Sequence, residues 1–237
     1  MLAGAARSCG LDVLVAAPSW DASGSSAAVT AVESNGRPVC REVELPGLEA
    51  PALAVEAAPA FIVRAALNGM FGPPPAVVLS GFNHGLNTGE AIIHSGTVGA
   101  ALTAGIGGVP GAAFSVDVAA RPGEPVHWDT AAFVARSVVP WLLEAGTPVV
   151  LNVNVPNVAG EALRGLERAH LAPVGTVQTT VTAEGTGERV AARPAGRRPP
   201  PPGSDTALVA AGMASYTPIR SVTEDRDPPS GQAHPRI

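Results

Sequence analysis

Short apolar runs alternate with helix-like segments along most of this 237-residue chain. Apolar runs bounded by Gly, Pro or polar residues predict buried strands at 11–17, 76–79, 109–118 and 149–156. Apolar residues at helical spacing predict helices at 1–9, 61–70, from Ser95 onward and at 130–145, the last with Asp129 as its N-cap. Strands that alternate with helices are typical of an α/β fold with a mostly parallel sheet.

The segments around and beyond this alternating region predict shorter β elements and connectors. Asn35-Gly36 is a strong hairpin turn signal and predicts a β excursion within 28–54. Residues 174–190 are rich in Val and Thr, which predicts an extended arm or hairpin, and a proline-rich connector follows at 194–202. We therefore divide the chain into a core at 1–160, an arm with its connector at 161–203, a C-terminal helix and strand at 204–221 and a disordered tail at 222–237.

Composition and charge exclude several classes of function. Hydrophobic residues make up 46% of the chain, which is enough for one substantial core. The formal net charge is −5, and the 15 basic residues are all Arg and form no basic stripe, so we expect no nucleic-acid polymer as a partner. No apolar run approaches the roughly 18 residues that cross a bilayer. Two cysteines do not make a disulfide scaffold. We therefore expect a cytoplasmic protein with no membrane partner.

A polar, glycine-rich segment follows the strand at 76–79 and leads into the helix that starts near Ser95. The Ser95 hydroxyl can cap this helix, and Gly96 lets backbone and ligand approach closely. The free N–H groups of a first helical turn attract anions, helped by the helix dipole, so we expect a phosphate site here. An ordinary serine cap gives the same sequence, and that alternative stays open. A second polar loop at 19–26 follows the strand at 11–17, at the carboxyl end where open α/β sheets bind ligands.

Four pieces of sequence, taken in order, resemble the SurE family of survival-protein nucleotidases. They are Val15-Ala-Ala-Pro18 followed by Ser23-Gly24-Ser25-Ser26; Ser80-Gly-Phe-Asn83 with Gly85 and Asn87; Ser95-Gly96-Thr97-Val98; and Leu151-Asn-Val-Asn154-Val-Pro156 with Ser215-Tyr-Thr217-Pro218. The resemblance implies a Rossmann-like, three-layer α/β core with a C-terminal β-hairpin arm that is swapped between the subunits of a homodimer or homotetramer. It also implies a metal-dependent phosphomonoesterase, a 5′/3′-nucleotidase that acts on nucleoside monophosphates with Mg²⁺ or Mn²⁺.

The resemblance also implies roles for individual residues. Metal ligands are expected at Ser23 and Asn83, phosphate contacts at Gly24, Asn87, Ser95, Gly96 and Thr97, and catalytic roles at Asn83, Ser95 and Thr97. The family's paired metal aspartates, in an Asn-Asp-Asp-Gly motif after its first strand, have no counterpart in this sequence. We therefore expect a core that is N-terminally truncated relative to the family, with a gap in its sheet. Asp21 and Glu90 lie in the site loops, where they either replace those carboxylates in part or are ordinary solvated side chains.

Three hypotheses for the function follow from these residues. The first is a metal-dependent nucleotidase that releases nucleoside and phosphate. The second is a non-catalytic or weakly active homologue that binds a nucleotide or phosphate, because neutral Ser and Asn oxygens hold Mg²⁺ poorly without carboxylates. The third is an oligomeric scaffold whose function resides in the arm at 174–190. Phosphate release from nucleoside monophosphates separates the first hypothesis from the other two.

Overall fold

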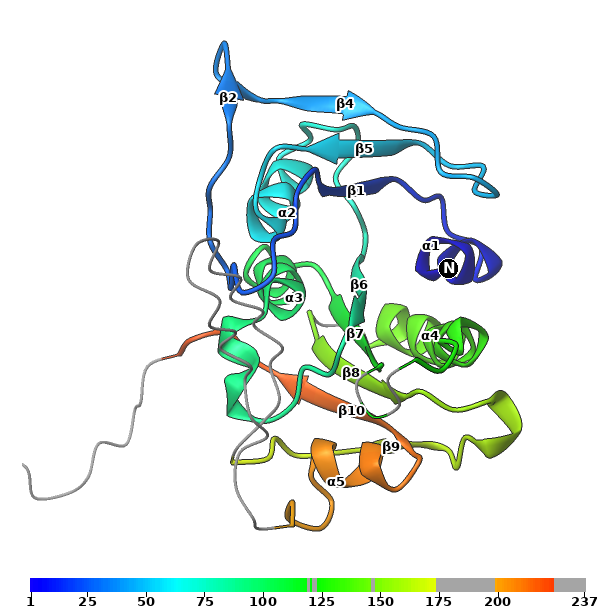
Figure 1. Ribbon diagram of the computed structural model, residues 1–237. Coiled ribbons are helices and arrows are strands. Elements are labelled where there is room, and N and C mark those ends of the chain that lie inside the picture. Colours follow the sequence, from blue (N-terminus) through cyan, green and yellow to red (C-terminus); the bar gives the residue numbers. More distant parts are fainter. Residues whose placement is uncertain (119, 121–122, 146–147, 174–198, 224–237) are drawn as a thin grey trace, which may run out of the picture.

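The computed structural model describes residues 1–118, 120, 123–145, 148–173 and 199–223. These residues form an α/β fold in which helices cover both faces of a mostly parallel sheet (Figure 1). The α/β class predicted from the alternating pattern is confirmed. The predicted arm at 174–190, most of the connector and the tail from 224 onward lie outside the described residues.

The larger sheet has five strands in the order β6-β7-β8-β10-β9. Their bounds are Val78–His84 for β6, Gly111–Asp117 for β7, Val150–Pro156 for β8, Leu166–Arg168 for β9 and Ala214–Ile219 for β10. Strands β6, β7 and β8 run parallel, whereas β10 is antiparallel to β8 and pairs in parallel with β9. Strand β8 is buried along its whole length and β7 along nearly all of it, as expected of central strands with both faces covered.

Helices pack on the two faces of these central strands (Figure 1). Helices α1 (Leu2–Ser8) and α4 (Trp128–Glu144) cover one face, and α3 (Gly96–Ile106) covers the other, with α2 (Pro59–Leu67) packed against α3 and β1. The core of the first face contains Phe114 from β7, Leu151 from β8 and Leu142 from α4, all nearly inaccessible to solvent. Because side chains alternate along a strand, the intervening residues of β7 and β8 point to the other face, where Ala113 and Val150 pack against α3 and the polar residues contact the loop before it.

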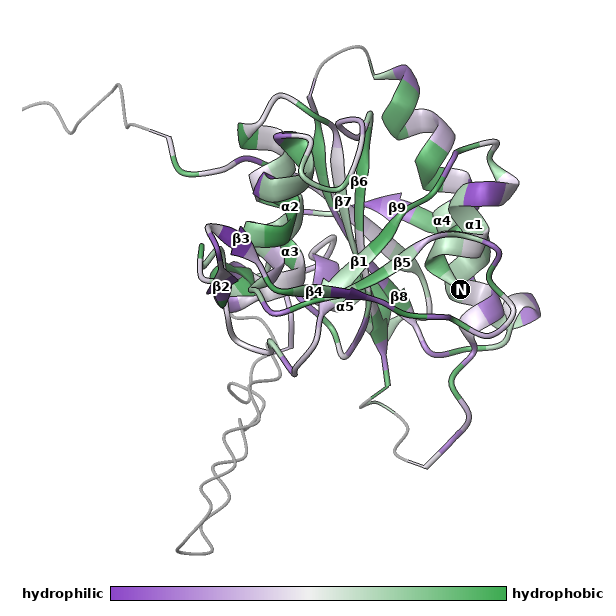
Figure 2. Cartoon of the chain, turned by 90° about the horizontal axis from the view of Figure 1, so that it is seen from above, coloured by the Kyte–Doolittle hydropathy of each residue, from purple (hydrophilic) through white to green (hydrophobic). Residues whose placement is uncertain are grey.

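A smaller sheet carries β1 (Val15–Pro18), β5 (Ala52–Val55) and β4 (Cys40–Glu42). Strand β5 pairs in parallel with β1 and in antiparallel with β4. The strands β2 (Glu33–Ser34) and β3 (Arg37–Pro38) form the hairpin predicted at Asn35-Gly36, and both turn residues have positive φ, as this turn requires. Figure 2 shows this hairpin as hydrophilic and β1 and β5 as mostly hydrophobic.

The two sheets share no paired strand among the described residues. Strand β1 pairs only with β5, and β6 pairs only with β7, so each has one edge without a strand partner in this part of the chain. Both strands remain partly exposed, in contrast to β7 and β8. The carboxyl ends of β1 and β6 nevertheless meet at one place, because Pro18 and Asn83 line the same cavity.

Several predicted boundaries are wrong for reasons of tertiary structure. Strand β6 continues through Asn83 to His84, which were predicted as loop, because their backbone pairs with β7 after a register shift that follows Ser80. Helix α4 begins with His127 at its N-cap position, so Asp129 lies in the first turn and is not the cap. The start of α3 at a Ser95 cap is confirmed.

Three further short elements complete the described structure. A short helix α5 (Asp205–Ala210) begins after the cap residue Ser204 and packs against β10. Two 3-10 turns, η1 (Glu90–His94) and η2 (Gly160–Ala162), precede α3 and β9. No helix in the described part of the chain combines the length and apolar character needed to cross a membrane.

Leu142 and Leu143 test the packing of α4 on the sheet. We expect Leu142→Ala to lower the free energy of unfolding by about 2–5 kcal/mol, because it opens a cavity at a site with 0% exposure. The neighbouring Leu143, which is 38% exposed, is the matched control. Its alanine variant should stay near the roughly 0.5 kcal/mol typical of surface substitutions. Urea unfolding followed by circular dichroism measures both, and equal losses would contradict this packing.

Candidate functional site

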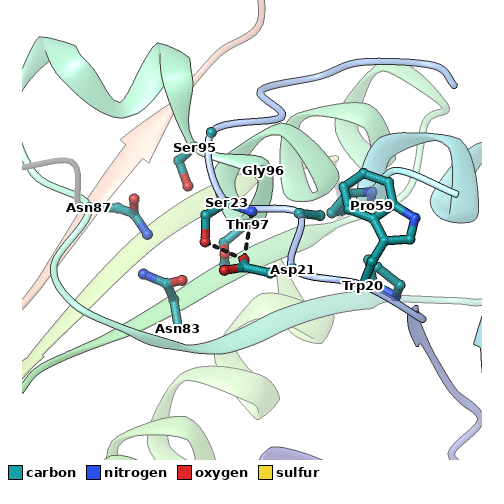
Figure 3. A pocket seen from close by; sticks show the side chains of 12 residues that line it. Trp20, Asp21, Ser23, Pro59, Asn83, Asn87, Ser95, Gly96 and Thr97 are labelled. Carbon is teal, nitrogen blue, oxygen red and sulfur yellow. Dashed lines mark hydrogen bonds between the residues drawn. The ribbon is translucent and has the colours of Figure 1, made fainter. Parts of the chain in front are cut away.

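A cavity of about 230 Å³ lies where β1 and β6 end and α3 begins (Figure 3). Its lining comprises Pro18, Trp20, Asp21, Ala22, Ser23, Gly24, Pro59, Asn83, Asn87, Ser95, Gly96 and Thr97. All seven residues that sequence analysis assigned to the site are among them. Their proximity is therefore established, whereas their individual roles stay predictions. This position matches the ligand site of open α/β sheets, at the carboxyl ends of the strands.

The N-terminus of α3 contributes hydrogen-bond donors to this cavity. The Oγ atom of Ser95 accepts a hydrogen bond of 3.1 Å from the N–H of Val98, which caps the helix. The N–H groups of Gly96 and Thr97 precede the first intrahelical bonds and have no acceptor within the described residues. Two unpaired N–H groups at the positive end of a helix dipole favour the binding of an anionic group.

Two glycines of α3 allow the loop at 19–26 to lie directly on the helix. A Cβ atom at Gly96 would stand 2.5 Å from Ser25 Oγ, and one at Gly99 would collide with the backbone carbonyl of Ser26. The hydroxyl of Ser26 donates a 2.6 Å hydrogen bond to the carbonyl of Ile93, which ties the loop to η1. The two glycines therefore allow close contact between the loop and α3. This contact places Ser23 beside the start of α3.

Asn87 is held by a layer of buried polar side chains on β7 and β8. Its N–H donates to Asn154 Oδ1 at 2.9 Å, and its side-chain amide donates to Ser115 Oγ at 2.7 Å. Its carbonyl accepts from the side-chain amides of Asn152 and Asn154, both at 2.8 Å. Asn87 itself is only 3% exposed. Both its backbone and its side chain are thus fixed by the sheet beneath it.

This polar layer was not predicted from the sequence as part of the site. The available signal is the alternation Leu151-Asn-Val-Asn154, which places a polar residue at every second position of an otherwise apolar strand. In a strand buried on both faces, such alternation indicates that one face meets a polar partner. That partner is the backbone of Asn87, which lies far away in sequence.

Asp21 provides the only carboxylate among the residues that line the cavity. One oxygen, Oδ1, accepts hydrogen bonds from the hydroxyl of Ser23 at 2.6 Å and from its N–H at 2.9 Å. These bonds, with the side-chain bond as the larger cause, lower the pKa of Asp21 below its usual value. Asp21 is therefore ionised at neutral pH. Glu90, the other candidate carboxylate, is not part of the lining.

The residues present offer oxygen ligands for one hard cation. Asn83 uses its side-chain N–H₂ group to donate to the carbonyl of Gly85 at 2.8 Å, which leaves its Oδ1 as an acceptor. Figure 3 shows the side chain of Asn83 opposite the hydrogen-bonded pair Asp21 and Ser23. One carboxylate and two neutral oxygens, completed by a substrate phosphate, fit the sparse protein ligation typical of Mg²⁺. No group of three or more His, Cys, Asp or Glu side chains that could bind a metal occurs among the residues described.

Comparisons with known proteins all find similarity to one family. A family model described as Survival protein SurE matches residues 1–178. The chain is 34% identical over 214 residues to 5′-nucleotidase SurE of Nitrosococcus oceani, covering 88% of this chain and 80% of the relative. It is 32% identical over 225 residues to 5′-nucleotidase SurE of Stenotrophomonas maltophilia, covering 93% and 83%. Among solved structures, the SurE protein of Aquifex aeolicus is similar, with a TM-score of 0.69, 29% identity and coverage of 92% and 86%.

Gly99 tests the contact between the loop at 19–26 and α3. We expect Gly99→Ala to push this loop away from the helix, because the added Cβ meets the backbone of Ser26 and cannot be relieved by a side-chain rotation. The melting temperature of the Gly99→Ala variant should therefore fall. The matched control is Gly4→Ala in α1, where no atom lies within 4 Å of the added Cβ. That variant should gain up to about 1 kcal/mol from helix propensity. A stable Gly99→Ala variant would refute the contact.

Asn154 tests the support beneath Asn87. Asn154→Ala leaves the buried N–H of Asn87 without its acceptor, which we expect to lower the free energy of unfolding by about 1–3 kcal/mol. The control on the neighbouring strand is Thr217→Val, because the buried Thr217 hydroxyl has no partner in the described part of the chain. This isosteric change should be close to neutral or stabilising. Chemical denaturation compares the two, and a larger loss for Thr217→Val would contradict the network.

Proposed function

The chain belongs to the SurE family, and we propose that it is a phosphomonoesterase that hydrolyses nucleoside monophosphates to nucleoside and phosphate. The observation that carries this proposal is the cavity where the unpaired N–H groups of Gly96 and Thr97 meet Asn83 and Ser23. These groups combine an anion site with oxygen ligands for a cation. The names of the relatives, 5′-nucleotidase SurE, support the substrate class.

The start of α3 binds the substrate phosphate. The N–H groups of Gly96 and Thr97 donate to two phosphate oxygens, and the hydroxyl of Thr97 offers a further donor. The Ser95 oxygen already accepts from Val98, so its own O–H remains available to donate to the phosphate. These donors are held in place before substrate arrives. They can therefore stabilise the charge that develops on the transferred phosphoryl group without reorganisation.

A divalent cation, Mg²⁺ or Mn²⁺, is expected to be held by Asp21, Ser23 and Asn83, and when bound it supplies charge neutralisation and a water of lowered pKa. The ionised carboxylate of Asp21 accepts the Ser23 hydroxyl proton in a hydrogen bond. This leaves the lone pairs of Ser23 Oγ to act as a ligand. Asn83 is oriented in the same way by its bond to Gly85, which keeps its Oδ1 free.

The nucleoside end of the substrate has an apolar surface available beside the phosphate site. Trp20 lines the cavity with its indole 48% exposed, and Figure 3 shows it beside Pro59. Stacking of a base on an aromatic ring contributes about 1–3 kcal/mol and tolerates every base. Trp20 therefore favours a nucleoside over a small aliphatic alcohol as the group attached to the phosphate.

A second candidate function is binding of a nucleoside monophosphate without hydrolysis. The observation that favours it is the single carboxylate of the cavity lining, because a weakly held cation activates water poorly. Calorimetry separates the two functions. Nucleotide binding that is independent of Mn²⁺ and is accompanied by no phosphate release would establish the second candidate.

The proposed activity is tested by phosphate release from 5′- and 3′-nucleoside monophosphates with Mg²⁺ or Mn²⁺. We expect release that stops on addition of EDTA, and we expect Asn83→Ala to lower kcat/KM at least about 10-fold through loss of a cation ligand. The control is Asn68→Ala, because Asn68 is an exposed asparagine whose side chain, among the described residues, bonds only the carbonyl of Arg64. Its activity should be unchanged. Metal-independent release, or equal effects of both substitutions, would refute the proposal.

A further inference from the structure

Asp205 is a fully buried carboxylate that does not line the cavity. It is the first residue of α5, and its exposure is 0%. Its Oδ2 accepts a 2.7 Å hydrogen bond from the N–H of Gly89. Its Oδ1 accepts from the N–H of Ala172 at 3.0 Å and from the N–H of Thr206 at 2.8 Å, with a longer contact of 3.4 Å to the Thr206 hydroxyl. Oδ2 therefore bonds the loop that leads to the site, and Oδ1 bonds backbone groups in the C-terminal part of the chain.

These bonds join segments that are far apart in sequence. Gly89 lies two residues after Asn87 and immediately before η1, which leads to Ser95. Its positive φ of 64° turns the backbone into η1. The N–H of Glu90 also donates to the carbonyl of Ala172 at 3.1 Å, so the entry to η1 is fixed at two successive residues. The backbone between Asn87 and Ser95, which both line the cavity, is thus held by contacts made outside the cavity.

The helix α5 does not need Asp205 for its N-cap. Ser204 already performs that role, since its Oγ accepts from the N–H of Ala207 at 3.3 Å. Burial of a polar side chain is costly unless donors and acceptors surround it. The donor at Oδ2 is the N–H of Gly89 in the site loop, so Asp205 also bonds a segment outside α5.

We propose that Asp205 is a positioning residue for the phosphate site. By holding Gly89, it sets the positions of Asn87 on one side of this glycine and Ser95 on the other. The sheet fixes Asn87 from below, through Asn154 and Ser115, and Asp205 fixes the chain as it leaves Asn87. The inference rests on the proposed function, because the cavity that Asp205 positions is the one assigned to substrate phosphate.

The variant Asp205→Asn isolates the bond to Gly89. In this variant the amide oxygen of Asn replaces Oδ1 and accepts from Ala172, so the amide N–H₂ group replaces Oδ2. This N–H₂ group then faces the N–H of Gly89, and two donors cannot bond each other. We expect hydrogen exchange of the Gly89 amide to accelerate at least about 10-fold. We expect affinity for inorganic phosphate, measured by titration of the Gly96 and Thr97 amide resonances, to fall about 10- to 100-fold, the range for a misplaced site.

Ser204→Ala is the matched control, because it removes the α5 cap and leaves the carboxylate of Asp205 in place. This variant should lose stability in α5 while it keeps the slow exchange of Gly89 and the wild-type affinity for phosphate. If Asp205→Asn does not fold, Asp205→Ser provides the same comparison, because serine is smaller and puts no N–H₂ group against Gly89.

The outcomes separate the inference from the proposed function. Equal phosphate affinity in wild type and in Asp205→Asn would overturn the inference, and so would an equal loss of affinity in Ser204→Ala. Absence of phosphate binding by the wild-type chain would overturn the proposed function. In that case, faster exchange of the Gly89 amide and shifted side-chain resonances of Asn87 in Asp205→Asn would still show that Asp205 positions this loop. Unchanged values would overturn the inference.

Discussion

The hydrogen bonds between Asn87 and the strands β7 and β8 determine where the candidate site lies. These strands bury apolar side chains such as Phe114 and Leu151 on one face and the polar side chains of Ser115, Asn152 and Asn154 on the other. Buried polar groups are tolerated where they are hydrogen-bonded. Asn87 is a partner of all three side chains, whereas Asn152 Oδ1 has no partner in the described part of the chain. The same strands thus build the core and fix the loop above it, so that loss of core packing also displaces the cavity.

Contacts other than strand pairing hold the two sheets together. Because β1 and β6 do not pair with each other, the packing of α2 against both β1 and α3 is one such connection. The loop that follows β1 adds a second contact, where Gly99 lets the backbone of Ser26 lie against α3. This contact brings residues of the smaller sheet to a cavity whose other wall belongs to the larger sheet. The geometry of the site therefore depends on how the sheets are joined.

Local patterns in the sequence predicted the elements that depend on neighbouring residues. The hairpin at Asn35-Gly36 and the cap at Ser95 were predicted because turn and cap chemistry acts within a few positions. The grouping of Ser23, Asn83 and Ser95 was expected from the resemblance to the SurE family, and the three residues line one cavity at the carboxyl ends of strands. The extension of β6 to His84 was not, since it depends on pairing with β7. The bonds of Asp205 to Gly89 and Ala172 were missed for the same reason, because they join segments that are distant in sequence.

The charges around the cavity bear on which of the two proposed functions the site serves. The start of α3 offers donors to an anion, whereas Asp21 on the facing loop is a carboxylate whose pKa is lowered by its bonds from Ser23. A site that only bound phosphate would gain nothing from a negative charge at its edge, even one screened by water, because that charge weakens anion binding. A cation placed between the carboxylate and the phosphate turns this repulsion into two attractions. Asp21 therefore supports a site that binds a cation and an anion together, which is the requirement of the proposed hydrolysis.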